Sequence, residues 1–245
     1  MAVMRRVLVV SACLAALAAP PAAAQSGVNL SWNDCGTAGA AERNWPCSAS
    51  TGGQLIVGSF VAPAGVIKLT GIEVVLEVQS AAPVLPDWWQ FRSGGCRQGQ
   101  LSANFLYSGS SCLDYWADAG GAMGGLAAYA VGSSGPNTAR VTLVAAVDQL
   151  QAVAVRSGGE YFAFNLAINN ARTSGPGACA GCGQSACVVL NSIRLTQPLG
   201  VGDFALNGAA NRNFVVWQGG GAGTCHGAGT KQNATFGQLK SLYRN

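Results

Sequence analysis

The chain has 245 residues, of which 49% are hydrophobic and only 10% are charged, well below the ~25% charged content of average globular proteins. Fourteen Lys and Arg against ten Asp and Glu give a net charge of +4. With no basic run and no stripe of Arg or Lys, this balance excludes a nucleic-acid-binding footprint. The 34 glycines and many β-branched residues favour a sheet protein with glycine-rich loops.

An export signal is predicted at the N-terminus. Arg5 and Arg6 precede an apolar stretch at 7–19, and a small-residue cleavage pattern follows. We therefore expect residues 1–24 to be a signal peptide, and residues 25–245 to form a single domain with a net charge of about +2. No apolar run in this mature chain approaches the ~20 residues of a transmembrane helix.

A second interpretation of the leader is that of a lipoprotein. Residues 10–13 resemble a lipobox, which would make Cys13 a lipidated first residue and anchor the protein at the cell surface. The apolar run continues past Cys13, whereas a lipoprotein tether is usually polar, so release from the cell or attachment at its surface remain the two predicted locations.

Strand patterns separated by Gly, Pro and Asn dominate the mature chain. The clearest pattern runs from Ile72 to Val78, where aliphatic side chains alternate with Glu73 and Glu77. These glutamates lie roughly 13 Å apart along a strand, too far for a glycosidase pair, and are expected on a solvated face. The other predicted strands are 54–62, 101–107, 139–147, 161–168, 187–196, 204–206 and 214–217.

These patterns predict an all-β fold, a single antiparallel β-sandwich of the jelly-roll or immunoglobulin-like kind. Residues 143–155 are rich in valine and favour strand and loop over helix. One helical turn is predicted at 86–91. A short amphipathic C-terminal helix is predicted at 235–244, because Phe236, Leu239 and Tyr243 recur at helical spacing.

Two clusters of aromatic and polar residues are candidates for a ligand site. Flat rings beside carboxylates and amides are what a sugar-binding face needs, because sugars present both C–H patches and hydroxyls. The competing interpretation is that the rings pack in the core or under a loop. The candidate residues are Asp87, Trp88, Trp89, Asp114, Tyr115 and Trp116.

An even number of cysteines in an exported chain predicts four disulfides. Local spacing favours Cys35–Cys47 and Cys96–Cys112, and leaves Cys225 to pair with one cysteine of a crowded glycine-rich loop. The CxxC in that loop is also compatible with a zinc ligand pair or a redox dithiol, which would require reduced thiols. The eight residues are Cys35, Cys47, Cys96, Cys112, Cys179, Cys182, Cys187 and Cys225.

The sequence contains few candidate catalytic residues or motifs. The single histidine, His226, follows Cys225 in a glycine-rich loop, and no GxSxG nucleophile motif occurs. Asp114 and Asp118 do not have the closely spaced oxygen donors of a calcium loop. We predict no catalytic residue, no metal site and no cofactor.

The mature chain resembles a group of uncharacterised secreted bacterial proteins. The resemblance rests on residues 32–36 (WNDCG), 57–63, 193–198 (IRLTQP) and 236–244 (FGQLKSLYR). Gly71 followed by an alternating strand is also similar to cohesin-like and carbohydrate-binding-module sandwiches. That second resemblance covers under half of the chain and implies a role in binding or assembly.

Together these observations predict a secreted, disulfide-stapled protein with a non-catalytic role in binding or surface structure. A carbohydrate-binding module that uses exposed aromatic residues is the first alternative, and a carbohydrate-active enzyme is the second. The expected partner is a polysaccharide or an extracellular protein.

Overall fold

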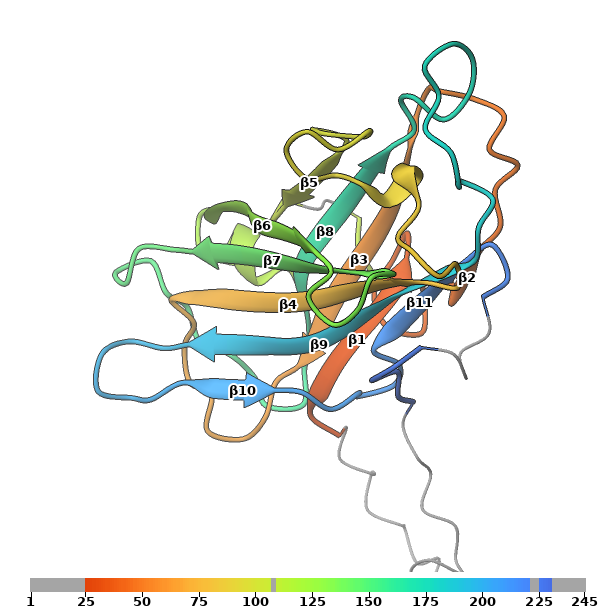
Figure 1. Ribbon diagram of the computed structural model, residues 1–245. Helices are drawn as coiled ribbons and strands as arrows, with labels where there is room; N and C mark the ends of the chain where they lie inside the picture. Colours follow the sequence, from red (N-terminus) through yellow and green to blue (C-terminus); the bar gives the residue numbers. More distant parts are fainter. Residues whose placement is uncertain (1–24, 107–108, 221–224, 231–245) are drawn as a thin grey trace, which may run out of the picture.

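The computed structural model describes residues 25–106, 109–220 and 225–230, which form two stacked β-sheets (Figure 1). The strands are β1 (Gly27–Trp32), β2 (Glu42–Arg43), β3 (Gly53–Val61), β4 (Gly71–Ser80), β5 (Leu101–Asn104), β6 (Met123–Val131), β7 (Thr138–Ala146), β8 (Glu160–Asn169), β9 (Ala186–Thr196), β10 (Phe204–Leu206) and β11 (Phe214–Trp217). Helical structure is confined in these residues to the 3-10 turn η1 (Asp87–Trp89) and the single-turn α1 (Tyr115–Asp118).

The smaller sheet has the strand order β1-β3-β8-β5, and the larger sheet has the order β2-β11-β9-β4-β7-β6. β10 pairs with β9 beyond the part of β9 that β11 covers. The strand pairs are antiparallel except for the two-residue pairing of β2 with β11. The predicted all-β sandwich is therefore confirmed.

The core between the sheets follows from the alternation of side chains along each strand. In β4, Ile72, Val74, Leu76 and Val78 are at most 3% exposed and belong to one continuous apolar cluster. Five tryptophans are also in this cluster, and large rings contribute most of the apolar area that a core buries. The inward face predicted for 72–78 is confirmed.

Strands β1, β2 and β6 and helix α1 were not predicted from the sequence. In β1, Asn29 and Ser31 face away from the core and are nevertheless buried, because loops cover the outer side of the smaller sheet. The Asn29 side chain accepts a hydrogen bond from the backbone N–H of Asn211 (2.8 Å). Val28, Leu30 and Trp32 alternate with these two polar residues, so the sequence does carry a period-two strand pattern here, which is only five residues long.

Strand β6 is rich in glycine and alanine, residues with low β propensity. It forms because β7 supplies a pairing partner over its whole length, with a register shift between Leu126 and Ala128. Pairing with a neighbour thus overrides local preference. At the other end of the chain, the predicted C-terminal helix at 235–244 lies outside the described residues, as does the predicted signal peptide.

Candidate functional site

The two adjacent tryptophans of η1 lie in the core. Trp88 is 0% exposed and Trp89 is 1% exposed. The Trp88 ring stacks on Trp217 at a centroid distance of 5.0 Å, and the Trp88 indole N–H donates to the Thr173 hydroxyl (3.0 Å). The predicted helical turn is confirmed, but its rings are not available to a ligand. Asp87, at the start of the turn, is exposed.

The second aromatic cluster is also buried. Tyr115 and Trp116 are at most 1% exposed. The Trp116 indole donates to the carbonyl of Ala163 (2.8 Å), which the β3–β8 register shift leaves unpaired across the sheet. The Tyr115 hydroxyl donates to the carbonyl of Leu69 (2.7 Å), and burial raises the pKa of Tyr115.

Asp114 has a structural role in this second cluster. Its carboxylate accepts hydrogen bonds from the backbone N–H groups of Trp116 and Ala117, each at 3.1 Å, and so caps the N-terminus of α1. The interpretation of the two clusters as exposed rings on a sugar-binding face is therefore wrong. Their rings are part of the core, and Asp114 fixes the turn that places two of them there.

Disulfide connectivity differs from the predicted local pairs. The bonds are Cys35–Cys112, Cys47–Cys182, Cys96–Cys179 and Cys187–Cys225. The predictions of Cys35–Cys47 and Cys96–Cys112 are wrong, while the expected pairing of Cys225 with one cysteine of the 179–187 loop is confirmed. Because all eight sulfurs are bonded in pairs, neither the zinc nor the free-dithiol interpretation applies to them.

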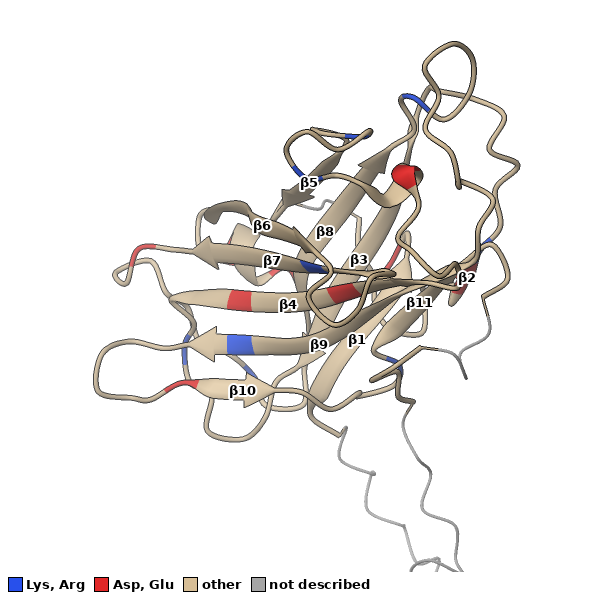
Figure 2. Ribbon diagram, viewed as in Figure 1, with Lys and Arg blue, Asp and Glu red and all other residues tan. Residues whose placement is uncertain are grey.

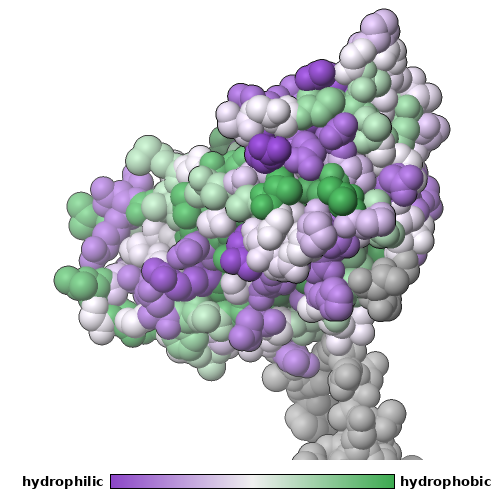
Figure 3. All heavy atoms as spheres, viewed as in Figure 1, coloured by the Kyte–Doolittle hydropathy of each residue, from purple (hydrophilic) through white to green (hydrophobic). Residues whose placement is uncertain are grey.

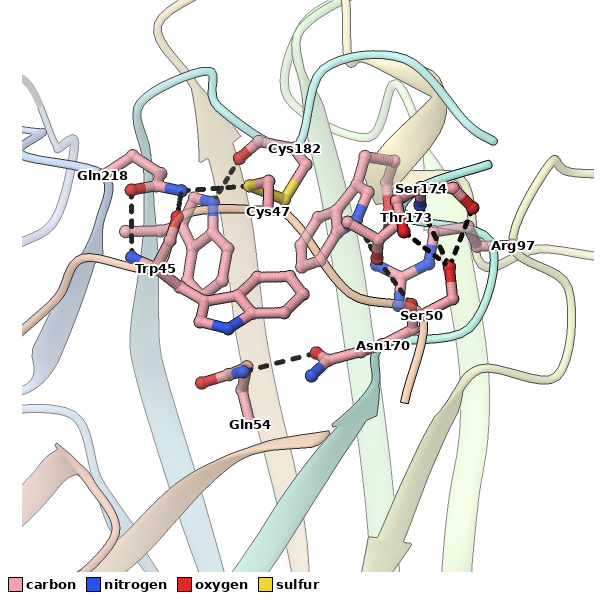
Figure 4. The surroundings of a disulfide bond; sticks show 12 residues. Trp45, Cys47, Ser50, Gln54, Arg97, Asn170, Thr173, Ser174, Cys182 and Gln218 are labelled. Carbon is pink, nitrogen blue, oxygen red and sulfur yellow. Dashed lines mark hydrogen bonds between the residues drawn. A yellow bond between two sulfur atoms is a disulfide. The ribbon is translucent and has the colours of Figure 1, made fainter. Parts of the chain in front are cut away.

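The Cys47–Cys182 bond closes one end of the sandwich above the aromatic core (Figure 4). Beside it, the Gln218 side chain accepts from the backbone N–H of Trp45 (3.2 Å) and donates to the Trp45 carbonyl (2.5 Å). The Trp217 indole donates to the Cys182 carbonyl (2.7 Å). These bonds hold two loops far apart in sequence against the same tryptophans.

A buried cation that sequence analysis missed lies in the same aromatic core (Figure 4). Arg97 is 0% exposed, and its guanidinium carbon is 3.9 Å from the centroid of the Trp88 ring. The guanidinium donates to the carbonyls of Trp88 (3.1 Å) and Asn169. Burial lowers the pKa of Arg97 to about 10, so it stays charged at neutral pH. Its sequence surroundings are polar and glycine-rich, which gave no indication of burial.

The outer face of the larger sheet carries few charged residues on its ribbon (Figure 2). Figure 3 shows the same side of the molecule as a patchwork of hydrophilic and hydrophobic residues. Glu73 is partly exposed and pairs with Arg194 at 3.5 Å. Glu77, four residues further along β4, is only 7% exposed. The expectation that both glutamates lie on a solvated face is therefore wrong for Glu77.

Glu77 is buried because it lines a polar cavity of about 370 Å³. The cavity walls come from the end of β4, the turn between β6 and β7, the start of β9, and Gly220 with His226. One Glu77 carboxylate oxygen accepts from the Gln79 amide (2.9 Å), and the other accepts from the Ser134 hydroxyl. No sequence motif predicts this cavity, because four segments spread over 150 residues of the chain form its walls.

His226 contributes to the cavity through its backbone. Its N–H donates to the side-chain oxygen Oε1 of Gln79 (2.7 Å), and its carbonyl accepts from the side-chain nitrogen Nε2 of Gln79 (2.8 Å). His226 is exposed. The neighbouring Cys187–Cys225 bond ties the segment 225–230 to β9, with a small apolar cluster beneath it. This segment forms one side of the cavity.

Within the described ranges, no group of three or more His, Cys, Asp or Glu side chains is arranged to hold a metal ion. The same part of the chain contains no helix with the length and apolar character that a membrane crossing requires.

No protein-family model and no curated protein matches the chain. A search of solved structures finds a cohesin module from the family 33 glycoside hydrolase of Clostridium perfringens ATCC13124, at 9% sequence identity and a TM-score of 0.36. The match covers 75% of this chain and 92% of that module.

Proposed function

We propose that the protein is an exported, non-catalytic binding module and that the cavity around Glu77 is its ligand site. One observation carries this proposal, namely a buried carboxylate that is held by two hydrogen bonds and faces a cavity of about 370 Å³. Ligand sites are typically preformed hollows of ~300–1,000 Å³ in which a few polar groups are fixed by their neighbours.

The lining of the cavity favours binding over hydrolysis of glycosides. Glu77 is the one carboxylate among the residues that line it. A glycosidase needs a second carboxyl group ~5–9.5 Å from the first. Glu73 does not supply it, because it pairs with Arg194 outside the cavity. This supports a site that holds a ligand without transforming it.

The four disulfides support an extracellular place of work, because such bonds persist in oxidising compartments. Release or retention at the cell surface both fit. The alternative of a carbohydrate-binding module loses its main support, because the rings offered for stacking, Trp88, Trp89, Tyr115 and Trp116, are buried. The proposed partner is a small polar molecule, or a polar side chain of an extracellular protein that enters the cavity.

A blocking variant tests the site without assuming the ligand's charge. Ala81 lines the cavity and is exposed, so Ala81→Trp is expected to fill the space and leave the fold intact. A panel of neutral, anionic and cationic small molecules and soluble oligosaccharides would be titrated into the mature protein by NMR. We expect at least one compound to bind the wild type and not the variant. If every compound binds the wild type and the variant equally, or binds neither of them, the proposed site is wrong.

A further inference from the structure

We infer that the cavity around Glu77 selects a primary ammonium or guanidinium group carried on a flexible stem. This inference rests on the proposed function and names the class of ligand for the same site. Charge, hydrogen-bonding capacity and size each contribute to it.

The charge of the cavity is negative. Glu77 is 7% exposed, and the two ion pairs of the described residues both involve Arg194, so Glu77 has no cationic partner in this part of the chain. Arg140 lies opposite Glu77 in the β4–β7 register, but it is exposed and forms no ion pair with Glu77. A carboxylate withdrawn from water is strongly stabilised by a cation that hydrogen-bonds to it.

Three of the four hydroxyl groups that line the cavity donate their hydrogens to acceptors of the protein itself. Ser134 donates to Glu77, Thr138 donates to the carbonyl of Gly135 (2.9 Å), and Ser185 donates to the carbonyl of Gln218 (2.6 Å). These three hydroxyls therefore have no hydrogen left to donate to a ligand and can only accept from it, whereas Ser80, the fourth hydroxyl of the lining, accepts from the backbone N–H of Ala82 and keeps its hydrogen.

The amide groups follow the same pattern. The amide nitrogen of Gln79 donates to Glu77 and to the carbonyl of His226, so both of its hydrogens are used. Asn137 donates one amide hydrogen to the carbonyl of Ser80 (2.7 Å). The capacity left over in the cavity is mainly that of acceptors. The ligand that complements it is rich in donors, as ammonium and guanidinium groups are.

The size of the cavity favours an organic cation over a metal ion. A space of about 370 Å³ accommodates a charged head together with an alkyl stem. A calcium site, by contrast, encloses its ion with six to eight oxygens, usually including several carboxylates, and this cavity has one. The stem then lies along the apolar part of the wall near Ala81 and Ala186.

The direct test is titration of three cations into the mature protein, followed by NMR: n-butylammonium, Nα-acetyl-lysine methylamide and Nα-acetyl-arginine methylamide. The neutral control is Nα,Nε-diacetyl-lysine methylamide. We expect the cations to bind and the neutral compound not to bind. Glu77→Gln, which keeps the shape and removes the charge, should weaken binding about 10- to 100-fold.

The matched control variant is Glu73→Gln, which removes the same charge from the same face of β4 outside the cavity and should leave binding within about twofold. Tighter binding of the lysine or arginine compound than of butylammonium would identify a protein side chain as the source of the cation, and equal binding would identify a free amine. Unchanged cation binding by Glu77→Gln would overturn the inference.

The inference and the proposed function fail separately. If a neutral or anionic compound binds the wild type and is lost in Ala81→Trp, the cavity is a ligand site and the inference about cations is wrong. If no compound distinguishes the wild type from Ala81→Trp, the proposed site itself is wrong.

Discussion

Arg97 and Glu77 are both charged side chains with almost no contact with solvent, yet their surroundings differ in one decisive way. Arg97 is enclosed by the faces of aromatic rings and by backbone carbonyls, in the middle of the core. Glu77 is held by two side chains but borders a cavity. An enclosed charge can only organise the protein around it, whereas a charge beside an open space remains able to interact with another molecule.

This difference predicts that variants around Arg97 change stability without affecting the ligand site, and that variants of Glu77 do the reverse. Withdrawing a charge from water costs free energy in both places, and the protein compensates for that cost in different ways. The core uses ring faces and carbonyls, and the outer face uses hydrogen bonds that leave part of the carboxylate unused. Four variants test this contrast.

The largest loss of stability is expected for Trp88→Ala. The ring is fully buried between Trp217 and Arg97, and its removal leaves a cavity among side chains that cannot close it. We expect the free energy of unfolding to fall by about 3–5 kcal/mol, measured by denaturant titration. Leu150→Ala is the control, because Leu150 is 96% exposed and should change stability by less than about 0.5 kcal/mol. A change of similar size in both variants would contradict the burial of Trp88.

Removal of the Cys47–Cys182 bond is expected to have the next largest effect. This bond joins residues 135 apart in sequence, so its absence frees a long loop in the unfolded chain. The double variant Cys47→Ala with Cys182→Ala should lose about 2–4 kcal/mol, again by denaturant titration. Mass mapping of the non-reduced protein gives an independent check, since peptides joined as Cys35–Cys47 would refute the connectivity.

A smaller loss is expected for Arg97→Met. Methionine replaces the long stem and removes the charge, which leaves the buried carbonyl of Trp88 and the partly buried carbonyl of Asn169 without their donor. We expect a loss of about 2 kcal/mol, with unchanged binding at the outer cavity. The exposed Arg92→Met serves as the control for loss of an arginine. Loss of cation binding in Arg97→Met would contradict the prediction that variants around Arg97 do not affect the ligand site.

The smallest effect on stability is expected for Glu77→Gln. The amide oxygen can still accept from Gln79, and the amide nitrogen can donate to Ser134 in place of accepting from it. We therefore expect the free energy of unfolding to change by less than about 1 kcal/mol, although cation binding weakens about 10- to 100-fold. A destabilisation as large as that of Trp88→Ala would show that the carboxylate is a structural element and not a ligand group.

The sequence predicted those parts of the molecule that depend on local patterns. Side chains alternate along a strand with a period of two, so 72–78 was assigned correctly to an inward and an outward face. The turn at 86–91 also followed from short-range features, and the presence of four disulfides followed from the even number of cysteines. Strand β6 was missed because its glycines and alanines form a strand only when β7 pairs with them.

The candidate site could not be predicted from the sequence, for a different reason. Disulfide partners were misassigned because spacing in the chain reflects only the cost of closing a loop, which grows slowly with its length. The cavity depends on Glu77, Ser134 and His226, which approach one another only after the larger sheet and its covering segment have formed. The side chains of Trp88 and Arg97 likewise acquire their roles from layers that are distant in sequence.

The Cys187–Cys225 bond bears on when the proposed site comes into existence. One wall of the cavity belongs to the segment that this bond fastens to β9. A chain still in a reducing compartment has no such bond. For the proposed site, formation of this wall is therefore coupled to oxidation of the two cysteines.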